Sequence, residues 1–202
     1  MHTHQVALIR HGETEWSMSG QHTGLTDIPL TENGRRVAQL LKPILGGVAF
    51  ARVWTSPMRR ARETCERAGL GEVAEVDRDL MEWNYGAYEG LTSEQIRAHA
   101  PGWVIFRDGC PGGERPAEMG ARVDRVIARV RAVDGDVALF AHGHFFRTFV
   151  ARWLGLPVAA GGHFLLDTAT LSILGSYQDL PAVKRWNAPL TAKDSSAGLT
   201  RR

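Results

Sequence analysis

The stretch Gln5-Val-Ala-Leu-Ile-Arg-His-Gly12 decides the fold of this chain. Its first part, residues 5–9, is a short apolar run, and such a run is typical of a strand buried on both faces of a parallel sheet. Arg10 and His11 follow the run directly. Ligands bind beyond the carboxyl ends of the strands in parallel sheets, so we expect the chemistry of the protein to lie at this turn.

A second strand is predicted over residues 52–55, and a helix rich in arginine follows it. Ser56 is a suitable N-cap and Pro57 a suitable first helical residue. This arrangement places Arg60 in the first turns of the helix, close to the carboxyl end of its strand.

A third apolar strand is predicted over residues 137–141, and it also ends in a histidine, His142. A helix that follows it reaches Trp153 and closes at Gly155, because glycine favours the left-handed conformation that ends helices. The carboxyl ends of parallel strands meet at one edge of a sheet, so we expect His142 to lie near the first histidine motif.

The remaining pattern alternates helices with strands. Thr31 caps a helix that runs to about Leu41, Thr92 begins a capping box, and Pro116 begins a long amphipathic helix. Two more strands are predicted over residues 170–174 and 183–186. This order predicts an α/β fold, a three-layer α/β/α sandwich with a mainly parallel sheet. We expect one domain over residues 1–190 and a polar tail over residues 191–202.

Composition excludes several classes of protein. The chain has 202 residues with 24 basic and 22 acidic side chains, and the basic ones do not form the runs typical of nucleic-acid binding. No stretch approaches the roughly 18 apolar residues of a membrane span. Cys65 and Cys110 are far apart and form no metal-binding or disulfide pattern. We therefore expect a cytoplasmic protein without nucleic-acid or membrane partners.

Several motifs occur in the order found in one known family. They are Arg10 to Thr14, Gly24 to Thr31, Ser56 to Ala61, Glu82 with Glu89-Gly90, and Ala141 to Gly143. Together they resemble the histidine phosphatase superfamily, branch 1, whose fold is phosphoglycerate mutase-like. The resemblance spans about residues 5 to 176. In motif it is strongest to the sedoheptulose-1,7-bisphosphatase-like members and the mycobacterial acid phosphatases.

The resemblance implies a role for each residue of the reacting centre. His11 is the nucleophile, Arg10 and Arg60 bind the phosphate, His142 is a second imidazole on the phosphate, and Glu82 is the proton donor. Phosphoryl transfer depends mainly on positioning and fixed positive charge, which two guanidiniums and an imidazolium supply without a metal or other cofactor. His11 requires a free nitrogen, so we expect an acceptor such as a backbone carbonyl on its other nitrogen.

The identity of the acid is open among four carboxyl groups. Glu13, Glu89 and Glu114 also lie near motif positions, and Glu82 ranks first because it precedes the glycine-glutamate turn with the family's spacing. His142 and His144 also form a pair that could bind a metal instead, but no further ligand motif completes such a site.

The narrower resemblance implies a set of residues around the sugar phosphate, with Arg147 as the ligand of a second phosphate. We expect the following residues to bind substrate: Ser17, Gln21, Thr23, Gly24, Trp83, Tyr85, Gly143, His144 and Arg147.

These observations predict a phosphomonoesterase that hydrolyses small phosphorylated metabolites, sugar phosphates or bisphosphates, through a phosphohistidine intermediate. Two alternatives share the motifs: a cofactor-dependent phosphoglycerate mutase, and a catalytically silent module that only binds phosphorylated ligands. The small metabolite is the expected partner, and a homodimer is left open.

Overall fold

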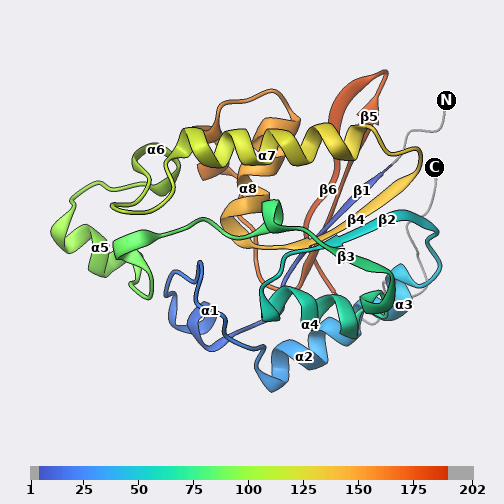
Figure 1. Ribbon diagram of the computed structural model, residues 1–202, viewed down its shortest axis with the longest axis horizontal. Coiled ribbons are helices and arrows are strands. Elements are labelled where there is room, and N and C mark those ends of the chain that lie inside the picture. Colours follow the sequence, from blue (N-terminus) through green and yellow to red (C-terminus); the bar gives the residue numbers. More distant parts are fainter. Residues whose placement is uncertain (1–4, 191–202) are drawn as a thin grey trace.

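The computed structural model describes residues 5–190 and is built around one sheet (Figure 1). Its strand order is β3-β2-β4-β1-β5-β6. Neighbouring strands are parallel except where β5 pairs with β1 and with β6. The predicted sheet is therefore confirmed as mainly parallel. The strands are β1 (Val6–Arg10), β2 (Phe50–Thr55), β3 (Ala74–Val76), β4 (Asp136–Ala141), β5 (Thr170–Tyr177) and β6 (Leu180–Pro189).

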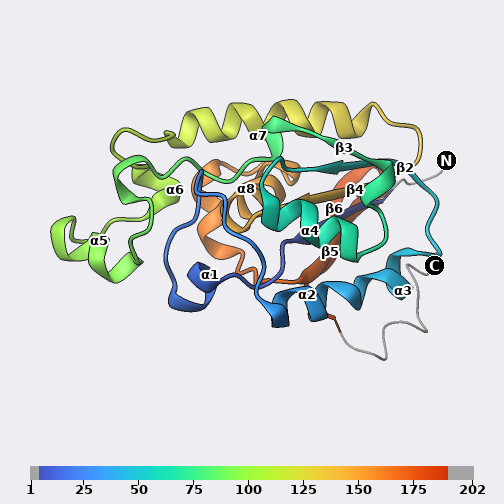
Figure 2. The same ribbon diagram turned by 60° about the horizontal axis from the view of Figure 1, so that its bottom comes forward.

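Helices cover both faces of the sheet, which confirms the predicted three layers. The helices α7 and α8 lie on one face, and α2, α3 and α4 lie on the other (Figures 1 and 2). The α-helices are α1 (Glu15–Ser19), α2 (Glu32–Gln39), α3 (Leu41–Leu45), α4 (Arg59–Arg67), α5 (Ser93–His99), α6 (Ile105–Asp108), α7 (Pro116–Arg131) and α8 (Gly143–Trp153). Short 3₁₀ turns lie at Gly71–Val73, Arg78–Leu80, Gly86–Tyr88 and Val158–His163.

Strand β1 is buried on both faces, as its apolar run predicts. Successive side chains of a strand point to opposite faces, so Leu8 joins the core under α7 and α8 while Ile9 joins the core under α3 and α4. The two are exposed by only 1% and 0%. The apolar stripe of α7 is also buried: Met119, Val123, Val126, Ile127 and Val130.

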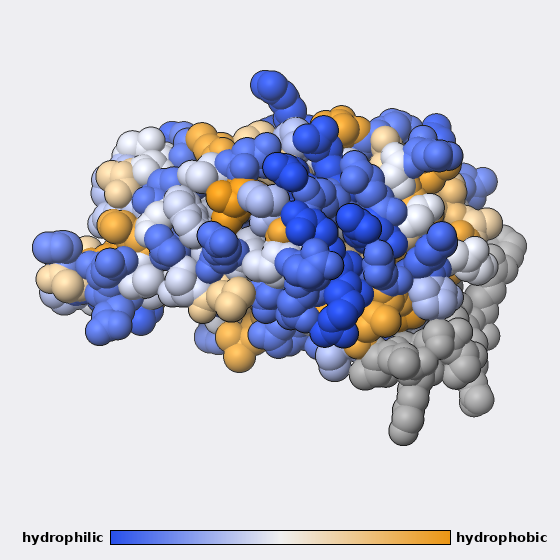
Figure 3. All heavy atoms as spheres, turned by 90° about the horizontal axis from the view of Figure 1, so that it is seen from below, coloured by the Kyte–Doolittle hydropathy of each residue, from blue (hydrophilic) through white to orange (hydrophobic). Residues whose placement is uncertain are grey.

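The outer faces of α2 and α4 are mainly hydrophilic, with scattered apolar side chains (Figure 3). Each of these helices buries one face and exposes the other, as amphipathic helices on a sheet do. No helix within residues 5–190 is long and apolar enough to cross a membrane.

Helix α4 begins later than the sequence predicts. It starts at Arg59 with Met58 as N-cap, so the predicted start at Pro57 is wrong by two residues. The Ser56 hydroxyl accepts a hydrogen bond from the Met58 N–H and also lies 2.7 Å from Nε2 of His142. Residues 56–57 therefore form a bend that serves the site, and the helix begins after it.

Two other boundaries differ from the predictions. The helix capped by Thr31 ends at Gln39, and Pro43 lies inside the separate short helix α3. Strands β5 and β6 extend beyond the predicted ranges and pair with two register shifts. The predicted polar tail, residues 191–202, lies outside the described residues.

A long excursion between β3 and α7 covers the carboxyl edge of the sheet (Figure 2). It is joined to the segment after α1 by a bridge between Gln21 and Thr92. The backbone of His22 adds two hydrogen bonds, its N–H to the Leu91 carbonyl and its carbonyl from the Gly90 N–H, each 2.9 Å. These bonds fix the side of a pocket at the edge of the sheet.

Candidate active site

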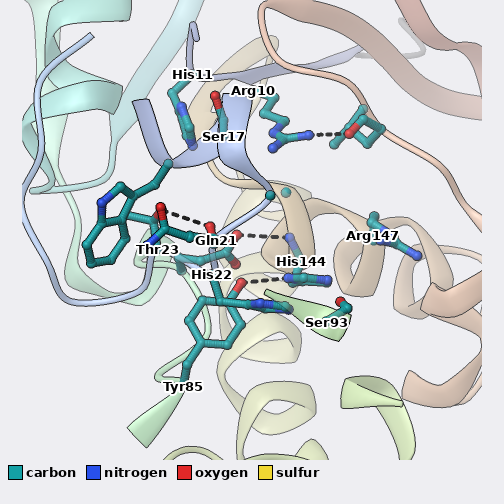
Figure 4. A pocket seen from close by; sticks show the side chains of 15 residues that line it. Arg10, His11, Ser17, Gln21, His22, Thr23, Tyr85, Ser93, His144 and Arg147 are labelled. Carbon is teal, nitrogen blue, oxygen red and sulfur yellow. Dashed lines mark hydrogen bonds between the residues drawn. The ribbon is translucent and has the colours of Figure 1, made fainter. Parts of the chain in front are cut away.

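A cavity of about 230 Å³ lies at the carboxyl ends of β1 and β4 (Figure 4). Its walls come from the end of β1, from α1 and the segment after it, from the excursion after β3, and from the start of α8. The lining residues are Arg10, His11, Trp16, Ser17, Gly20, Gln21, His22, Thr23, Glu82, Tyr85, Ser93, Gly143, His144, Arg147 and Leu166.

His11 is held in a single tautomer. Its Nδ1 lies 2.8 Å from the carbonyl oxygen of Gly12. A carbonyl only accepts hydrogen bonds, so Nδ1 carries the proton and Nε2 keeps a free lone pair. Burial first, and then the guanidiniums of Arg60 and Arg10, lower the pKa of His11 well below its ordinary value. The ring is thus neutral near pH 7, with the free nitrogen that a nucleophile needs.

Arg10 carries a donor that lacks a partner. Its Nη1 donates to the Leu166 carbonyl, while the buried Nε has no hydrogen-bond partner in residues 5–190. Leaving a buried donor unpaired costs about 1–3 kcal/mol, and a bound anion would relieve that cost. A Cβ at Gly143 would lie 3.3 Å from this Nε, so glycine there lets the guanidinium lie close to the start of α8.

Arg60 is fully buried and anchored to backbone carbonyls and to His142. Its Nη1 donates to the Thr26 carbonyl and its Nη2 to the carbonyls of Thr23 and Gly24, all at 3.0 Å. Burial lowers the pKa of Arg60, and the Glu82 carboxylate opposes that effect. A guanidinium stays charged at any working pH, so Arg60 supplies fixed positive charge beneath His11.

His142 is neutral in this arrangement, and the predicted imidazolium at this position is wrong. The Arg60 Nε donates to its Nδ1 at 3.2 Å, so the proton of His142 lies on Nε2 and is donated to the Ser56 hydroxyl. Burial, followed by the charge of Arg60, lowers the pKa of His142 well below its ordinary value. Its ring centroid lies 5.2 Å from that of His11.

The two histidines considered as a metal-binding pair are hydrogen-bonded within the protein. Both ring nitrogens of His142 are engaged by protein groups, and Nδ1 of His144 contacts the Tyr85 hydroxyl. Residues 5–190 contain no group of three or more potential ligands that could hold a metal ion.

Glu82 lies at the amino terminus of α8. Its Oε2 accepts from the His144 N–H at 3.0 Å, and its Oε1 accepts from the Phe145 and Trp83 N–H groups, both at 2.9 Å. Backbone N–H groups and the dipole at a helix amino terminus both favour a carboxylate group at this place.

The other three carboxyl groups considered for the acid do not line the cavity. Glu13 accepts from the Thr31 hydroxyl, and Glu89 accepts from the Gly24 and Thr26 N–H groups. Glu114 pairs with Arg122. Of the four candidates, Glu82 alone has a carboxyl group in the cavity wall.

A buried ion pair holds the segment that carries Glu82. Arg122 on α7 contacts both carboxylate oxygens of Glu114, at 2.9 and 2.7 Å. The same guanidinium donates to the carbonyls of Asp79, Met81 and Glu82. Both charged side chains are only 13% exposed, so the pair fixes this segment against the long helix.

Comparison with known proteins identifies the family. A model of the histidine phosphatase superfamily (branch 1) matches residues 6–189. The chain belongs to this superfamily. An acid phosphatase from Mycobacterium tuberculosis is 43% identical over 176 residues, which cover 85% of this chain and 86% of the relative. Sedoheptulose 1,7-bisphosphatase from Saccharomyces cerevisiae is 38% identical, with 77% and 69% of the two chains covered.

Solved structures share the fold of this histidine phosphatase. The product of open reading frame Rv3214 of M. tuberculosis has a TM-score of 0.89 and 40% identity, over 93% of this chain and 99% of the other. Mycobacterial glucosyl-3-phosphoglycerate phosphatase Rv2419c, in complex with VO3, has a TM-score of 0.81 and 30% identity, over 92% and 99%. These similarities confirm the predicted phosphoglycerate mutase-like fold and phosphatase class.

The predicted substrate residues divide into two groups. Gly24 and Trp83 do not line the cavity. Trp83 is fully buried, and its indole N–H donates to the Glu114 carbonyl. Gly24 lies under the Arg60 guanidinium, where a Cβ would lie 2.6 Å from the Trp83 carbonyl oxygen. The other predicted residues do line the cavity: Ser17, Gln21, Thr23, Tyr85, Gly143, His144 and Arg147.

Two of the lining residues are already engaged within the protein. The Ser17 hydroxyl completes a capping box with Thr14, whose N–H and carbonyl it bonds at 2.9 and 2.8 Å. The Gln21 amide donates to the Gly90 carbonyl and accepts from the Ser19 hydroxyl. Both side chains therefore shape the wall more than they offer free polar atoms.

His22 is a lining residue that the sequence analysis missed. The residue is 9% exposed, and its ring packs edge-on to Tyr85 with 4.8 Å between ring centroids. Its position between Gln21 and Thr23, two residues predicted to bind substrate, was the only available signal. Trp16 and Ser93 also line the cavity and were missed.

Arg147 places a second guanidinium in the cavity wall (Figure 4). It donates to the carbonyls of Gly161 and Gly162, each at 3.2 Å, and lies 4.7 Å from the centre of the Phe106 ring. Burial, and then the positive charge of Arg10, lower the pKa of Arg147, so an excess of positive charge acts at this wall. Such an environment favours an anionic ligand.

Proposed function

We propose that this histidine phosphatase hydrolyses phosphate monoesters of small metabolites through a phosphohistidine at His11. One observation carries the proposal: His11 is neutral with a free Nε2, and the charges of Arg60 and Arg10 act on its ring. The Arg10 Nε, buried without a partner in residues 5–190, supplies a donor for a phosphate oxygen.

The proposed reaction has two displacements at phosphorus. In the first, Nε2 of His11 forms a bond to phosphorus while the ester P–O bond breaks, and Glu82 gives a proton to the departing oxygen. In the second, water attacks phosphorus and the P–N bond breaks, while Glu82 takes the proton of the water. Inorganic phosphate leaves, and His11 returns to its neutral tautomer.

The positive groups stabilise the charge that develops on the phosphoryl oxygens. In the proposal Arg10 contacts them through Nε, and Arg60 keeps its charge next to His142. In the proposal His142 contributes a neutral N–H, which must turn from the Ser56 hydroxyl toward the phosphate when substrate binds.

The substrate class of the proposal rests on the relatives and on the cavity wall. The relatives are named as phosphatases of a sedoheptulose bisphosphate and of glucosyl-3-phosphoglycerate. We propose that sugar phosphates are also the substrates of this chain. Arg147 contacts the second phosphate when the substrate is a bisphosphate. The cytoplasm is the proposed compartment, because Cys65 and Cys110 are both free thiols.

The direct test is turnover of p-nitrophenyl phosphate by the wild type and by His11→Ala, each with and without EDTA. We expect the wild type to release phosphate equally with and without chelator, and His11→Ala to be inactive. His99→Ala, on the exposed side of α5, is the matched control. An active His11→Ala variant or full inhibition by EDTA would overturn the mechanism.

A substrate panel then separates hydrolysis from the mutase and binding alternatives. Sugar monophosphates, sugar bisphosphates and phosphoglycerates are compared by kcat/KM for phosphate release. Interconversion of phosphoglycerates without phosphate release would establish the mutase, and binding without turnover would establish the silent module. Sedimentation of the purified chain settles whether it forms a homodimer.

A further inference from the structure

Two histidine rings face each other beside the reacting end of the cavity. The rings of His22 and His144 are parallel within 2°, and their centroids lie 5.7 Å apart. Both residues line the cavity, and Figure 4 shows their rings close to Tyr85 and Ser93. The mechanism above uses neither ring, and in each ring only Nδ1 is hydrogen-bonded within residues 5–190.

His22 presents an acceptor. Its Nδ1 lies 2.8 Å from the Leu91 carbonyl oxygen. A carbonyl only accepts, so the proton of the ring lies on Nδ1 and Nε2 keeps its lone pair. Burial lowers the pKa of His22, so the ring stays neutral near pH 7.

His144 presents a donor. Its Nδ1 lies 2.6 Å from the Tyr85 hydroxyl oxygen. Burial raises the pKa of Tyr85 well above its ordinary value, so the hydroxyl keeps its proton. Burial and then Arg147 lower the pKa of His144, whose ring is neutral. Both groups are satisfied when the hydroxyl donates to Nδ1, which leaves the proton of His144 on Nε2.

We propose that His22 and His144 form a neutral subsite that recognises a hydroxyl group on the leaving-group part of the substrate. A hydroxyl both donates and accepts, so it complements one lone pair and one N–H group. Two bonds of about 2.8 Å to one oxygen span at most about 5.6 Å. The ring centroids lie 5.7 Å apart, so the pair fits one hydroxyl or two neighbouring hydroxyls of a polyol.

The same arrangement disfavours an anionic group at this place. A phosphate or carboxylate offers only acceptor atoms, so it has no hydrogen to donate to the lone pair of His22. The subsite therefore selects a polyhydroxylated phosphate monoester, and any second phosphate lies beyond it toward Arg147. This inference rests on the proposed function, because it concerns the leaving group of that reaction.

The test compares two alkyl esters that differ in hydroxyl groups, glycerol 3-phosphate and n-propyl phosphate. The readout is the ratio of their kcat/KM values, because a fault in the chemical step cancels in this ratio. The variants are His22→Phe, which keeps an aromatic ring, and Tyr85→Phe, which removes only the hydroxyl that sets the His144 tautomer. His99→Phe is the matched control on the exposed side of α5.

We expect the wild type and His99→Phe to prefer glycerol 3-phosphate by tenfold or more, and both cavity variants to lose most of that preference. Circular dichroism and thermal unfolding establish which variants are folded, and either one suffices for the test. A wild type without the preference, or a folded variant that retains it, overturns the subsite. Failure of the wild type to hydrolyse p-nitrophenyl phosphate would instead overturn the proposed function.

Discussion

Replacing Arg122 with methionine should destabilise the protein strongly. The change removes both contacts to Glu114 and the donors to the Asp79, Met81 and Glu82 carbonyls. Breaking a buried ion pair costs about 3–5 kcal/mol, because the remaining charge is left without a partner. The two side chains are 13% exposed, so we expect the lower end, about 3 kcal/mol.

Urea unfolding of Arg122→Met and Arg125→Met measures this difference. Arg125 lies on the same helix and pairs with Asp79, but its side chain is 58% exposed. Exposed pairs contribute about 0.2–1 kcal/mol, so the control should unfold almost as the wild type does. The reasoning would be refuted if the free energies of unfolding of Arg122→Met and Arg125→Met differed by less than about 1 kcal/mol, because an exposed ion pair contributes no more than that.

The same variant tests whether the ion pair positions Glu82. A displacement of about 1 Å at a catalytic group can cost about 10²-fold in rate, so we expect kcat for alkyl phosphates to fall about that much. The double variant Arg122→Met/Glu114→Leu should regain stability, because it leaves no unpaired charge, but should not regain kcat. Recovery of both together would show that the pair acts on stability alone.

Three further predictions follow from the site. Glu82→Gln should slow alkyl phosphates at least about 10²-fold but should spare the first phosphoryl transfer from p-nitrophenyl phosphate, whose leaving group needs no proton; burst kinetics measure both. Acid should destabilise the protein, because the lowered pKa values of His11 and His142 let the unfolded chain bind protons that the folded chain does not. This stability is complete above the unfolded pKa of about 6.5 and declines below it, by up to about 1.4 kcal/mol per ring at about pH 5.5, as measured by urea midpoints. Vanadate should raise the Tm of the wild type and should raise that of Arg10→Met much less, since the Arg10 Nε has no partner within residues 5–190 and can donate to the anion.

Much of the fold and of the reacting centre could be predicted from short stretches of the sequence. The apolar strand before Arg10 and His11 is visible in a few residues, and so are the capping box at Thr92 and the start of α7 at Pro116. Each depends on interactions within a few positions along the chain, which a sequence displays directly.

The predictions were wrong or incomplete where a residue's position depends on contacts with residues far away in the sequence. Ser56 looks like a helix cap, yet its hydroxyl bonds His142, which is 86 positions away. Trp83 follows Glu82 but packs edge-on to Phe106 in the core, 5.8 Å between ring centroids. His22 gains its place because its backbone N–H and its ring both bond the Leu91 carbonyl, on a segment that the sequence gives no reason to bring near.

The central claim is that phosphorus becomes bonded to His11. Glu82→Gln, given p-nitrophenyl phosphate and quenched in alkaline denaturant, should accumulate the bonded form because water activation is impaired. Intact-mass and peptide analysis should show one added phosphoryl group, on the peptide that contains His11, and none in His11→Asn. Two results would contradict the account. One is steady turnover by the wild type while neither the wild type nor Glu82→Gln carries a phosphoryl adduct, and the other is an adduct on a residue other than His11.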